Sequence, residues 1–344
     1  MEKKTRFWKN LFSIVTILLS IGILTFFLFE GNGANNLRHV VFNLQPAWLL
    51  CILGGVIAGW FLESYVLHLF CRHLKKDWTF GQSFYVGMVE LYYSAITPFC
   101  MGEPMEIYNM NKMGMDVGVA SSIVAVKSIL HHGVTFLYAL VLISFKLNYF
   151  QTTVSNFSFV SLFGLVTNSI FIAGVFLFMM DEKLTNSILQ VCIKGLNKLK
   201  LKKAAQKLDN KVHQELALFH NASKMIGKSY MLYSYAIFLT FIQITVASFI
   251  SYFVYRSFNL KNESVLIIIA ADTFVTMAAS FIPLPGSSGG AEGGFYLFLK
   301  GFFGSSIVPA ITLWRVATYY INILFCGLYV YILKRKYRPD AFDL

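Results

Sequence analysis

Charged residues are scarce in this sequence: they make up only 13% of the chain, whereas hydrophobic residues make up 56%. A soluble domain carries charged side chains at roughly 25% of its positions. The shortage therefore excludes a soluble enzyme, a nucleic-acid-binding protein and a disordered chain. The 344 residues instead predict an all-α membrane protein that crosses the bilayer several times.

Cysteine and the motifs of familiar catalysts are scarce as well. The five cysteines include no Cys-x-x-Cys pair, which argues against a disulfide framework and against a metal knuckle. No zincin, α/β-hydrolase, Walker A or dinucleotide-binding motif occurs in the sequence context that its chemistry requires. We therefore expect no metal site, no cofactor and no conventional catalytic residue.

Acidic residues are fewer than basic ones, 17 against 29, and the net charge is +12. In a membrane protein such an excess marks the loops that face the anionic cytoplasmic leaflet. Basic groups lie before the first apolar stretch, after the second, within 181–228 and after the last, so both termini are expected in the cytoplasm. We interpret the N-terminal stretch as a retained signal anchor, because it lacks a small-residue cleavage site.

Apolar stretches of about 20 residues are long enough to span a bilayer. Six stretches meet this length: 11–29, 47–70, 117–145, 157–180, 229–255 and 306–333. Two more, 80–96 and 264–282, run directly into proline- and glycine-rich breaks. If both crossed fully, the basic segments could not all be cytoplasmic. We therefore predict two re-entrant segments, 80–115 from the cytoplasmic side and 264–304 from the outer side; one missed or extra full span is the alternative.

This arrangement divides the chain into a first membrane half (1–180), a basic cytoplasmic linker (181–228) and a second membrane half (229–344). In the linker, lysines and apolar residues alternate at helical spacing. One interpretation is an amphipathic helix lying on anionic inner-leaflet lipids. The other is a solvated helix between the halves, and the two are compatible.

The two breaks have the composition that ends a helix inside a membrane. Thr97, Pro98 and Pro104 mark the first break, and Pro283 and Pro285 begin the second, which continues in glycine and serine to 294. Irregular backbone at membrane depth is tolerated only inside protein or beside a water-filled cavity. Broken helices that enter from opposite sides are how many transporters build a central binding site.

The two halves also match loosely in charge. Each has an acid before the break, an acid within or just after it, and a base in the following span. These pairs are Glu90 with Asp272, Glu103 with Glu292, and Lys127 with Arg315. The correspondence indicates an inverted repeat around the linker, and a chance match is the alternative.

Charges inside a bilayer need a partner or a wet cavity. Lys127, one helical turn before His131, could bind a phosphate, or could form an internal ion pair with Glu90 or Glu103. Arg315 could grip a phosphate with two nitrogen atoms, or could pair with Asp272 or Glu292.

The glycine-rich break offers a different kind of binding group. Backbone amides around Gly286, Gly289 and Gly290 could form an anion nest, or the glycines could only permit close packing. The carboxylates Glu103 and Glu292 would suit a cationic headgroup amine, a proton or a coupling cation. We assign Glu63 and His68 to structure or to the cavity wall.

Three groups of residues resemble the motifs of a known family. They are Thr97-Pro98 with Gly102-Glu103-Pro104 and Tyr108; Pro283, Pro285-Gly286, Gly289-Gly290 and Glu292; and Trp314-Arg315 with Tyr319-Tyr320. The chain is similar to the lysylphosphatidylglycerol synthase/flippase transmembrane family, the membrane half of the multiple peptide resistance factor. It departs from the family at Met101, at Glu106, where a basic residue is common, and at Ser287-Ser288.

The resemblance implies a bacterial-type plasma membrane and a translocase that moves aminoacyl-phosphatidylglycerol between leaflets. In full-length members a separate soluble domain transfers the amino acid from tRNA; this chain ends at Leu344, so we expect no such activity from it. The alternatives are a membrane-embedded lipid transferase and a non-catalytic partner of a separate lipid synthase. The headgroup, the energy source, the direction of movement and the oligomeric state stay open.

Overall fold

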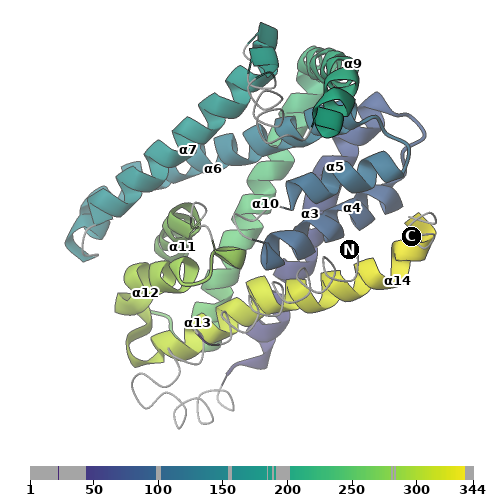
Figure 1. Cartoon of the computed structure of the whole chain (residues 1–344). Helices are drawn as coiled ribbons and strands as arrows, with labels where there is room; N and C mark the ends of the chain where they lie inside the picture. The colour runs from purple at the N-terminus through teal and green to yellow at the C-terminus, as the bar shows by residue number, and fades with distance from the viewer. Residues whose placement is uncertain are drawn as a thin grey trace.

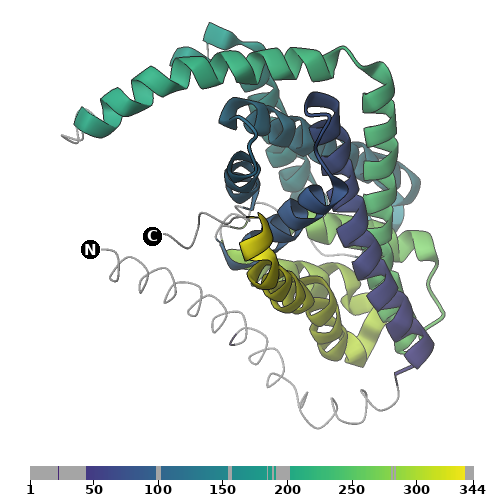
Figure 2. The same cartoon turned by 90° about the vertical axis from the view of Figure 1, so that its right-hand side faces the viewer.

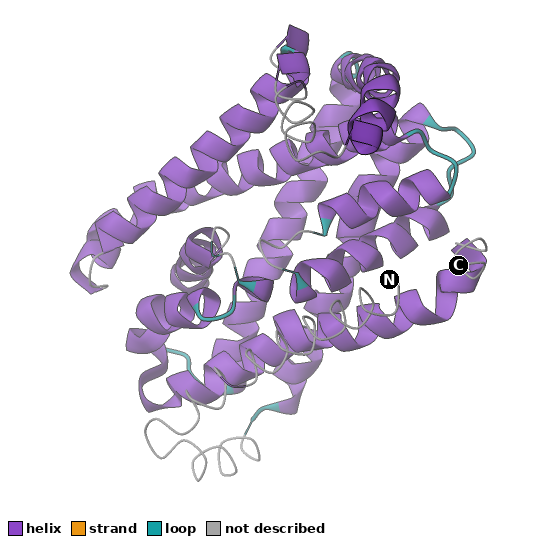
Figure 3. Ribbon diagram, in the orientation of Figure 1, coloured by secondary structure: helices purple, strands orange, loops and turns teal. Residues whose placement is uncertain are grey.

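The computed structural model describes residues 44–97, 102–153, 157–183, 185–187, 202–279 and 284–337, together with residues 22, 190 and 282. Every regular element in these residues is a helix and none is a strand (Figure 3). Five helical segments are long and apolar enough to cross a membrane. The predicted all-α polytopic fold is therefore confirmed. Apart from residue 22, the predicted first span at 11–29 lies outside the described residues.

Four predicted spans correspond to single helices. These are α3 (Pro46–Leu74), α6 (Val117–Thr153), α7 (Phe157–Met180) and α10 (Tyr230–Ser257). α3 packs against α10, and α6 packs against α7 (Figure 1). α6 continues beyond the predicted end at 145, because the residues from 146 to 153 include no glycine or proline that would stop it.

The first break separates the two arms of a helical hairpin. α4 (Phe80–Ile96) begins with a capping box formed by Thr79 and Gln82. α5 (Glu103–Lys112) begins with Pro104 in its first turn, where the missing N–H has no helical partner to lose. The two arms pack against each other. Pro98 and the rest of the break, 98–101, lie outside the described residues.

The second break joins α11 (Val265–Ala279) to α12 (Gly290–Phe303) through the short 3₁₀ helix η2 (Pro285–Ser287). Its backbone is left-handed at Gly286, with φ of 56°. A Cβ at Gly286 would also overlap the ring of Tyr319. Glycine is therefore required at 286 both by conformation and by space. Pro283 lies outside the described residues.

The two hairpins meet at their breaks. η2 contacts α4 of the first hairpin. In Figure 1, α4 and α5 approach the middle of the molecule from one side, while α11 and α12 approach it from the other. The side of the bilayer from which each hairpin enters stays a prediction.

The predicted last span at 306–333 is part of a longer helical run. After α12 the chain forms η3 (Gly304–Ser306), α13 (Ile307–Arg315), the π-helical segments η4 (Val316–Tyr320) and η5 (Asn322–Cys326), and α14 (Gly327–Tyr337). A Cβ at Gly327 would overlap the ring of Tyr92, so this glycine permits the close contact with α4. π-Helical turns are often found at functional sites.

The linker contains α9 (Lys202–Gly227), which packs against α6. The N–H of Gly118 donates to Glu215 Oε2 at 2.7 Å, and the hydroxyls of Ser122 and Ser223 are 2.9 Å apart. Figure 2 shows the N-terminal end of α9 projecting beyond the other helices. The C-terminal part of the linker is thus docked on the membrane helices. Its predicted contact with anionic lipids stays a prediction.

Candidate functional site

A cavity of about 810 Å³ lies where the two hairpins meet. The first hairpin contributes Glu103 and Pro104 to its wall, and the second contributes Gly286 and Ser287. Helices α3, α6, α7, α10 and α13 and the π-helical segments η4 and η5 contribute the rest of the wall. Both breaks therefore border one space, as the sequence predicted for a central site.

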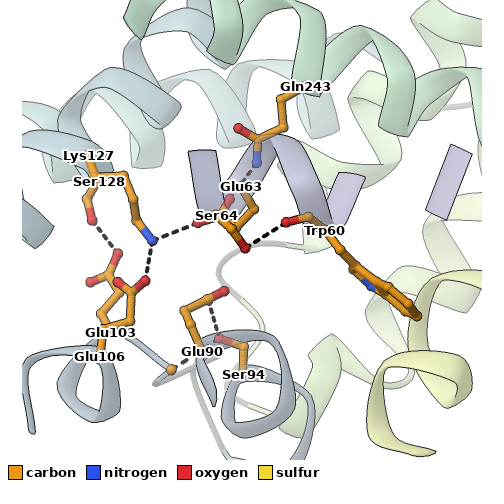
Figure 4. Close-up of polar contacts among 11 residues, drawn as sticks. Trp60, Glu63, Ser64, Glu90, Ser94, Glu103, Glu106, Lys127, Ser128 and Gln243 are labelled. Atoms are coloured by element: carbon orange, nitrogen blue, oxygen red, sulfur yellow. Dashed lines mark hydrogen bonds and ion pairs between the residues drawn. The ribbon is translucent and has the colours of Figure 1, made fainter. Parts of the chain in front are cut away.

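Lys127 of α6 is the centre of a buried ion-pair network. Its Nζ lies 2.7 Å from Glu63 Oε1 on α3 and 2.6 Å from Glu106 Oε1 on α5 (Figure 4). Gln243 of α10 donates to the other oxygen of Glu63. The network therefore ties four helices together through side chains alone.

The partners of Lys127 differ from the predicted ones. The sequence indicated Glu90 or Glu103 for the internal ion pair, whereas the structure has Glu63 and Glu106. Glu106 lies about one helical turn beyond Glu103 on α5, and that turn brings its carboxylate to the ammonium group instead. Glu63 is 64 residues away in the chain and comes close through the packing of α3 near α6. His131, one turn after Lys127, lines the cavity as well.

Glu103 and Glu90 face the same space, and neither forms an ion pair with a base among the described residues. Glu103 accepts a hydrogen bond from the hydroxyl of Ser128. Glu90 Oε1 accepts from Ser94 Oγ at 2.7 Å, and Ser94 Oγ accepts from the N–H of Gly102 at 3.1 Å. The Glu90 carboxyl is thus linked through one hydroxyl to the residue at which α5 starts.

Arg315 of α13 forms the corresponding pair on the other side of the cavity. Its Nε lies 2.6 Å from Glu292 Oε1, and its Nη2 donates to the carbonyl of Gly286 at 3.1 Å. The guanidinium carbon also lies 4.7 Å from the centre of the Tyr319 ring. Of the two predicted partners, Glu292 is therefore the one that Arg315 uses, and Asp272 is not.

Glu292 lies behind Arg315 and does not border the cavity. It is 1% exposed, and its second oxygen accepts from the N–H of Gly289 at 2.6 Å. Arg315 itself lines the cavity although it is only 4% exposed. In this conformation Glu292 holds the guanidinium in place rather than facing a ligand.

The amides of the glycine-rich break are turned inward. The N–H groups of Ser287 and Ser288 donate to the carbonyls of Leu284 and Pro285 at 2.8 and 3.2 Å. Gly289 donates to Glu292. Of the three predicted nest glycines only Gly286 lines the cavity, and its carbonyl is bonded to Arg315. Of the amides of the predicted anion nest, that of Gly289 is therefore already bonded to Glu292 in this conformation.

The remaining candidates lie outside the cavity wall. Asp272 is buried in α11 and accepts from the hydroxyl of Ser251 on α10. Thr97 donates to the carbonyl of Tyr93 and so ends α4. Pro285 is buried in η2, and Gly290 is placed so that a Cβ would overlap Ile282.

Comparison with known proteins places the chain among membrane proteins of lipid metabolism. The family described as lysylphosphatidylglycerol synthase TM region matches residues 13–326. This chain belongs to that family.

A protein from Archaeoglobus fulgidus, described as a UPF0104 membrane protein, is 25% identical to this chain over 351 residues. The alignment covers 94% of this chain and 98% of the archaeal protein. The match thus spans both hairpins and the helices that surround the cavity.

Proposed function

We propose that this family member is a lipid translocase, a flippase-like protein that moves a phospholipid such as aminoacyl-phosphatidylglycerol, or a related lipid-linked headgroup, between the two leaflets. The observation that carries the proposal is the cavity of about 810 Å³ bordered by both breaks. Its volume lies within the range of about 300–1,000 Å³ that is common for ligand sites.

The side chains around the cavity suit the two ends of such a headgroup. A cationic amine would be received by Glu103, which has only a hydroxyl donor as a partner here. The phosphate would be received by Lys127 and Arg315, the bases that line the cavity. Both side chains are ion-paired in this conformation. A phosphate can therefore bind only if it displaces the carboxylates or contacts Lys127 and Arg315 together with them.

Movement of the lipid would come from rocking of the two hairpins about the shared cavity, so that it opens alternately to each leaflet. The ion pairs on each side would hold the closed arrangement. A substrate can shift this equilibrium only if it binds one arrangement better than the other. Competition between the phosphate and the carboxylates for Lys127 and Arg315 supplies such a difference.

The test is headgroup-resolved transbilayer movement in proteoliposomes that contain the purified full-length chain. We expect Glu103→Ala and Arg315→Ala to lower the rate at least about tenfold, the effect of losing roughly 1.4 kcal/mol of interaction. The exposed acid variant Glu182→Gln is the matched control. Unchanged movement in the two cavity variants would remove these residues from the mechanism.

A membrane-embedded lipid transferase is the second candidate, because the family description names a synthase. Lipid mass spectrometry of expressing cells separates the candidates. A new lipid species that depends on Glu103 would favour the transferase, and redistribution without a new species favours transport. If the cavity charges can be neutralised with no effect beyond stability, the chain is a partner of a separate lipid synthase.

A further inference from the structure

The part of the cavity wall around Lys127 contains more carboxyl groups than lysines and arginines. Glu63, Glu90 and Glu103 line the cavity and Glu106 lies directly behind it, whereas Lys127 is the one lysine or arginine of this group. Four ionised carboxylates and one ammonium would leave three uncompensated negative charges. An uncompensated charge at membrane depth is costly unless a partner or water compensates it. A proton or a cation bound among these carboxyls would compensate that charge.

The carboxyls are close enough to act as one group. Glu90 interacts electrostatically with Lys127, Glu63 and Glu103. Glu106 interacts with Lys127, Glu90 and Glu63. In Figure 4 the carboxyls of Glu63 and Glu106 are seen on either side of the Lys127 ammonium. A charge placed on one of these groups is therefore felt by the others.

A second observation points to a missing positive partner. Glu106 is 0% exposed, and its Oε2 has no hydrogen-bond partner among the described residues. A buried carboxylate oxygen without a donor is costly, because it has lost water and gained nothing. A proton on the carboxyl group, or a cation beside it, would remove that cost.

We propose that these four carboxyl groups form a proton-loading site, and that a cationic lipid headgroup enters the cavity in exchange for a proton bound at Glu90. The exchange is balanced: the protonated Glu90 carboxyl releases its proton to water in the cavity, and the lipid ammonium, received at Glu103, replaces that proton as the counter-charge of the carboxyl cluster. This inference rests on the proposed function, since it supplies the energy source for the same cavity.

Glu90 is the group best placed for the exchange. It lines the cavity, and among the described residues its hydrogen-bond donor is the neutral hydroxyl of Ser94. Glu63 and Glu106 are engaged by Lys127. Because Ser94 also accepts from the N–H of Gly102, the charge on Glu90 bears on the start of α5. Loading and release of the proton are thereby connected to the first hairpin.

Other titratable groups around Glu90 leave this assignment intact. His131 of α6 faces Glu63, Lys127 and Glu103. Cys326 of η5 lies within electrostatic range of Glu90. Arg315 lines the same cavity but is neutralised by Glu292. These groups leave the first hairpin with its excess of carboxyls.

The first measurement is proton release on binding. The full chain, in weakly buffered dodecyl maltoside micelles, is titrated with lysylphosphatidylglycerol while the pH is recorded. We expect protons to be released as the lipid binds, and Glu90→Gln to release about one proton fewer per bound lipid than the wild type. The exposed variant Glu182→Gln should match the wild type. Absence of release from the wild type would overturn the proton-loading site.

The second measurement is coupling in proteoliposomes that contain trace fluorescent lysylphosphatidylglycerol and an imposed pH gradient. With one proton exchanged per lipid, each pH unit should shift the steady-state ratio of the lipid between leaflets about tenfold, and a protonophore should abolish the shift. Movement that ignores the pH gradient, or that follows a sodium gradient instead, would overturn the coupling and leave the translocase intact. Proton release without lipid movement would overturn the translocase and keep the proton-loading site. The loss of both would overturn both proposals.

Discussion

Lys127 in the first half of the chain and Arg315 in the second are the lysine and the arginine that the described residues place in the cavity wall, but their surroundings differ. Arg315 has one carboxylate partner, which is itself fixed by the N–H of Gly289, and its guanidinium is also bonded to the Gly286 carbonyl. Lys127 has two carboxylate partners on two other helices. Arg315 is fixed by backbone groups and its charge is balanced by Glu292. Lys127 is held by side chains, among carboxyl groups that outnumber it.

This difference separates two ways in which a membrane protein can bury charge. An ion pair that is electrically balanced and fixed by backbone groups can take up little further charge, and it serves to position a side chain. An unbalanced cluster held by side chains can take up and release cations while its helices stay packed. The first hairpin is therefore the better candidate for exchange, and the second for shaping the cavity.

The largest effect is expected from Arg315→Ala, which leaves Glu292 buried at 1% exposure without its counter-charge. Breaking a buried ion pair from one side costs roughly 3–5 kcal/mol. Thermal unfolding in detergent should show the loss, and Arg315→Leu combined with Glu292→Leu should recover much of it. An unchanged melting temperature in Arg315→Ala would contradict the structural role given to this pair.

At acidic pH, Lys127→Ala should destabilise the protein by less than Arg315→Ala does. The difference in stability between these two variants should widen as the pH falls. Without the ammonium, Glu63 and Glu106 favour protonation in the folded state, so the folded state binds more protons than the unfolded state and stability falls as the pH rises. Melting temperatures of both variants at several pH values measure this. A loss in Lys127→Ala that does not vary with pH would contradict the view that Lys127 balances these two carboxyls.

Gly286→Ala tests the backbone that holds Arg315. The substitution places a Cβ against the ring of Tyr319 at a left-handed φ of 56°, and such strain costs about 1–3 kcal/mol. Gly293→Ala is the matched control, because a Cβ there meets nothing within 4 Å inside α12 and should stabilise the helix by roughly 0.5–1 kcal/mol. Equal effects of the two substitutions would show that the break tolerates a side chain.

The smallest effect is expected from Lys224→Ala, which removes the exposed pair between α9 and Glu182. Lys224 lowers the pKa of Glu182 through its hydrogen bond and its charge, so any contribution to stability is present at neutral pH and fades as the pH falls through the acidic range. Exposed pairs contribute little because water and salt screen them. A clear drop in melting temperature would mean that the docking of α9 depends on this contact.

Much of the site could be named from the sequence because its chemistry is local. Proline and glycine end helices wherever they occur, so both breaks could be placed before the structure was known. Glu103, Lys127, His131, Gly286 and Arg315 line the cavity as a central site would require. In the sequence, Glu106 stands out only as a departure from the family pattern. Nothing in the sequence distinguishes Glu63 from an ordinary residue of the cavity wall.

The sequence by itself determined that the chain lies in a membrane, that its helices break at two places, and which ionisable groups are available beside them. The tertiary structure decided which acid reaches which base, and that the Gly289 amide of the second break is bonded to Glu292. The reason is physical: helix periodicity fixes which residues share a face, but the rotation and separation of packed helices decide which faces meet. The left-handed backbone at Gly286, in contact with Tyr319, decides where its carbonyl points.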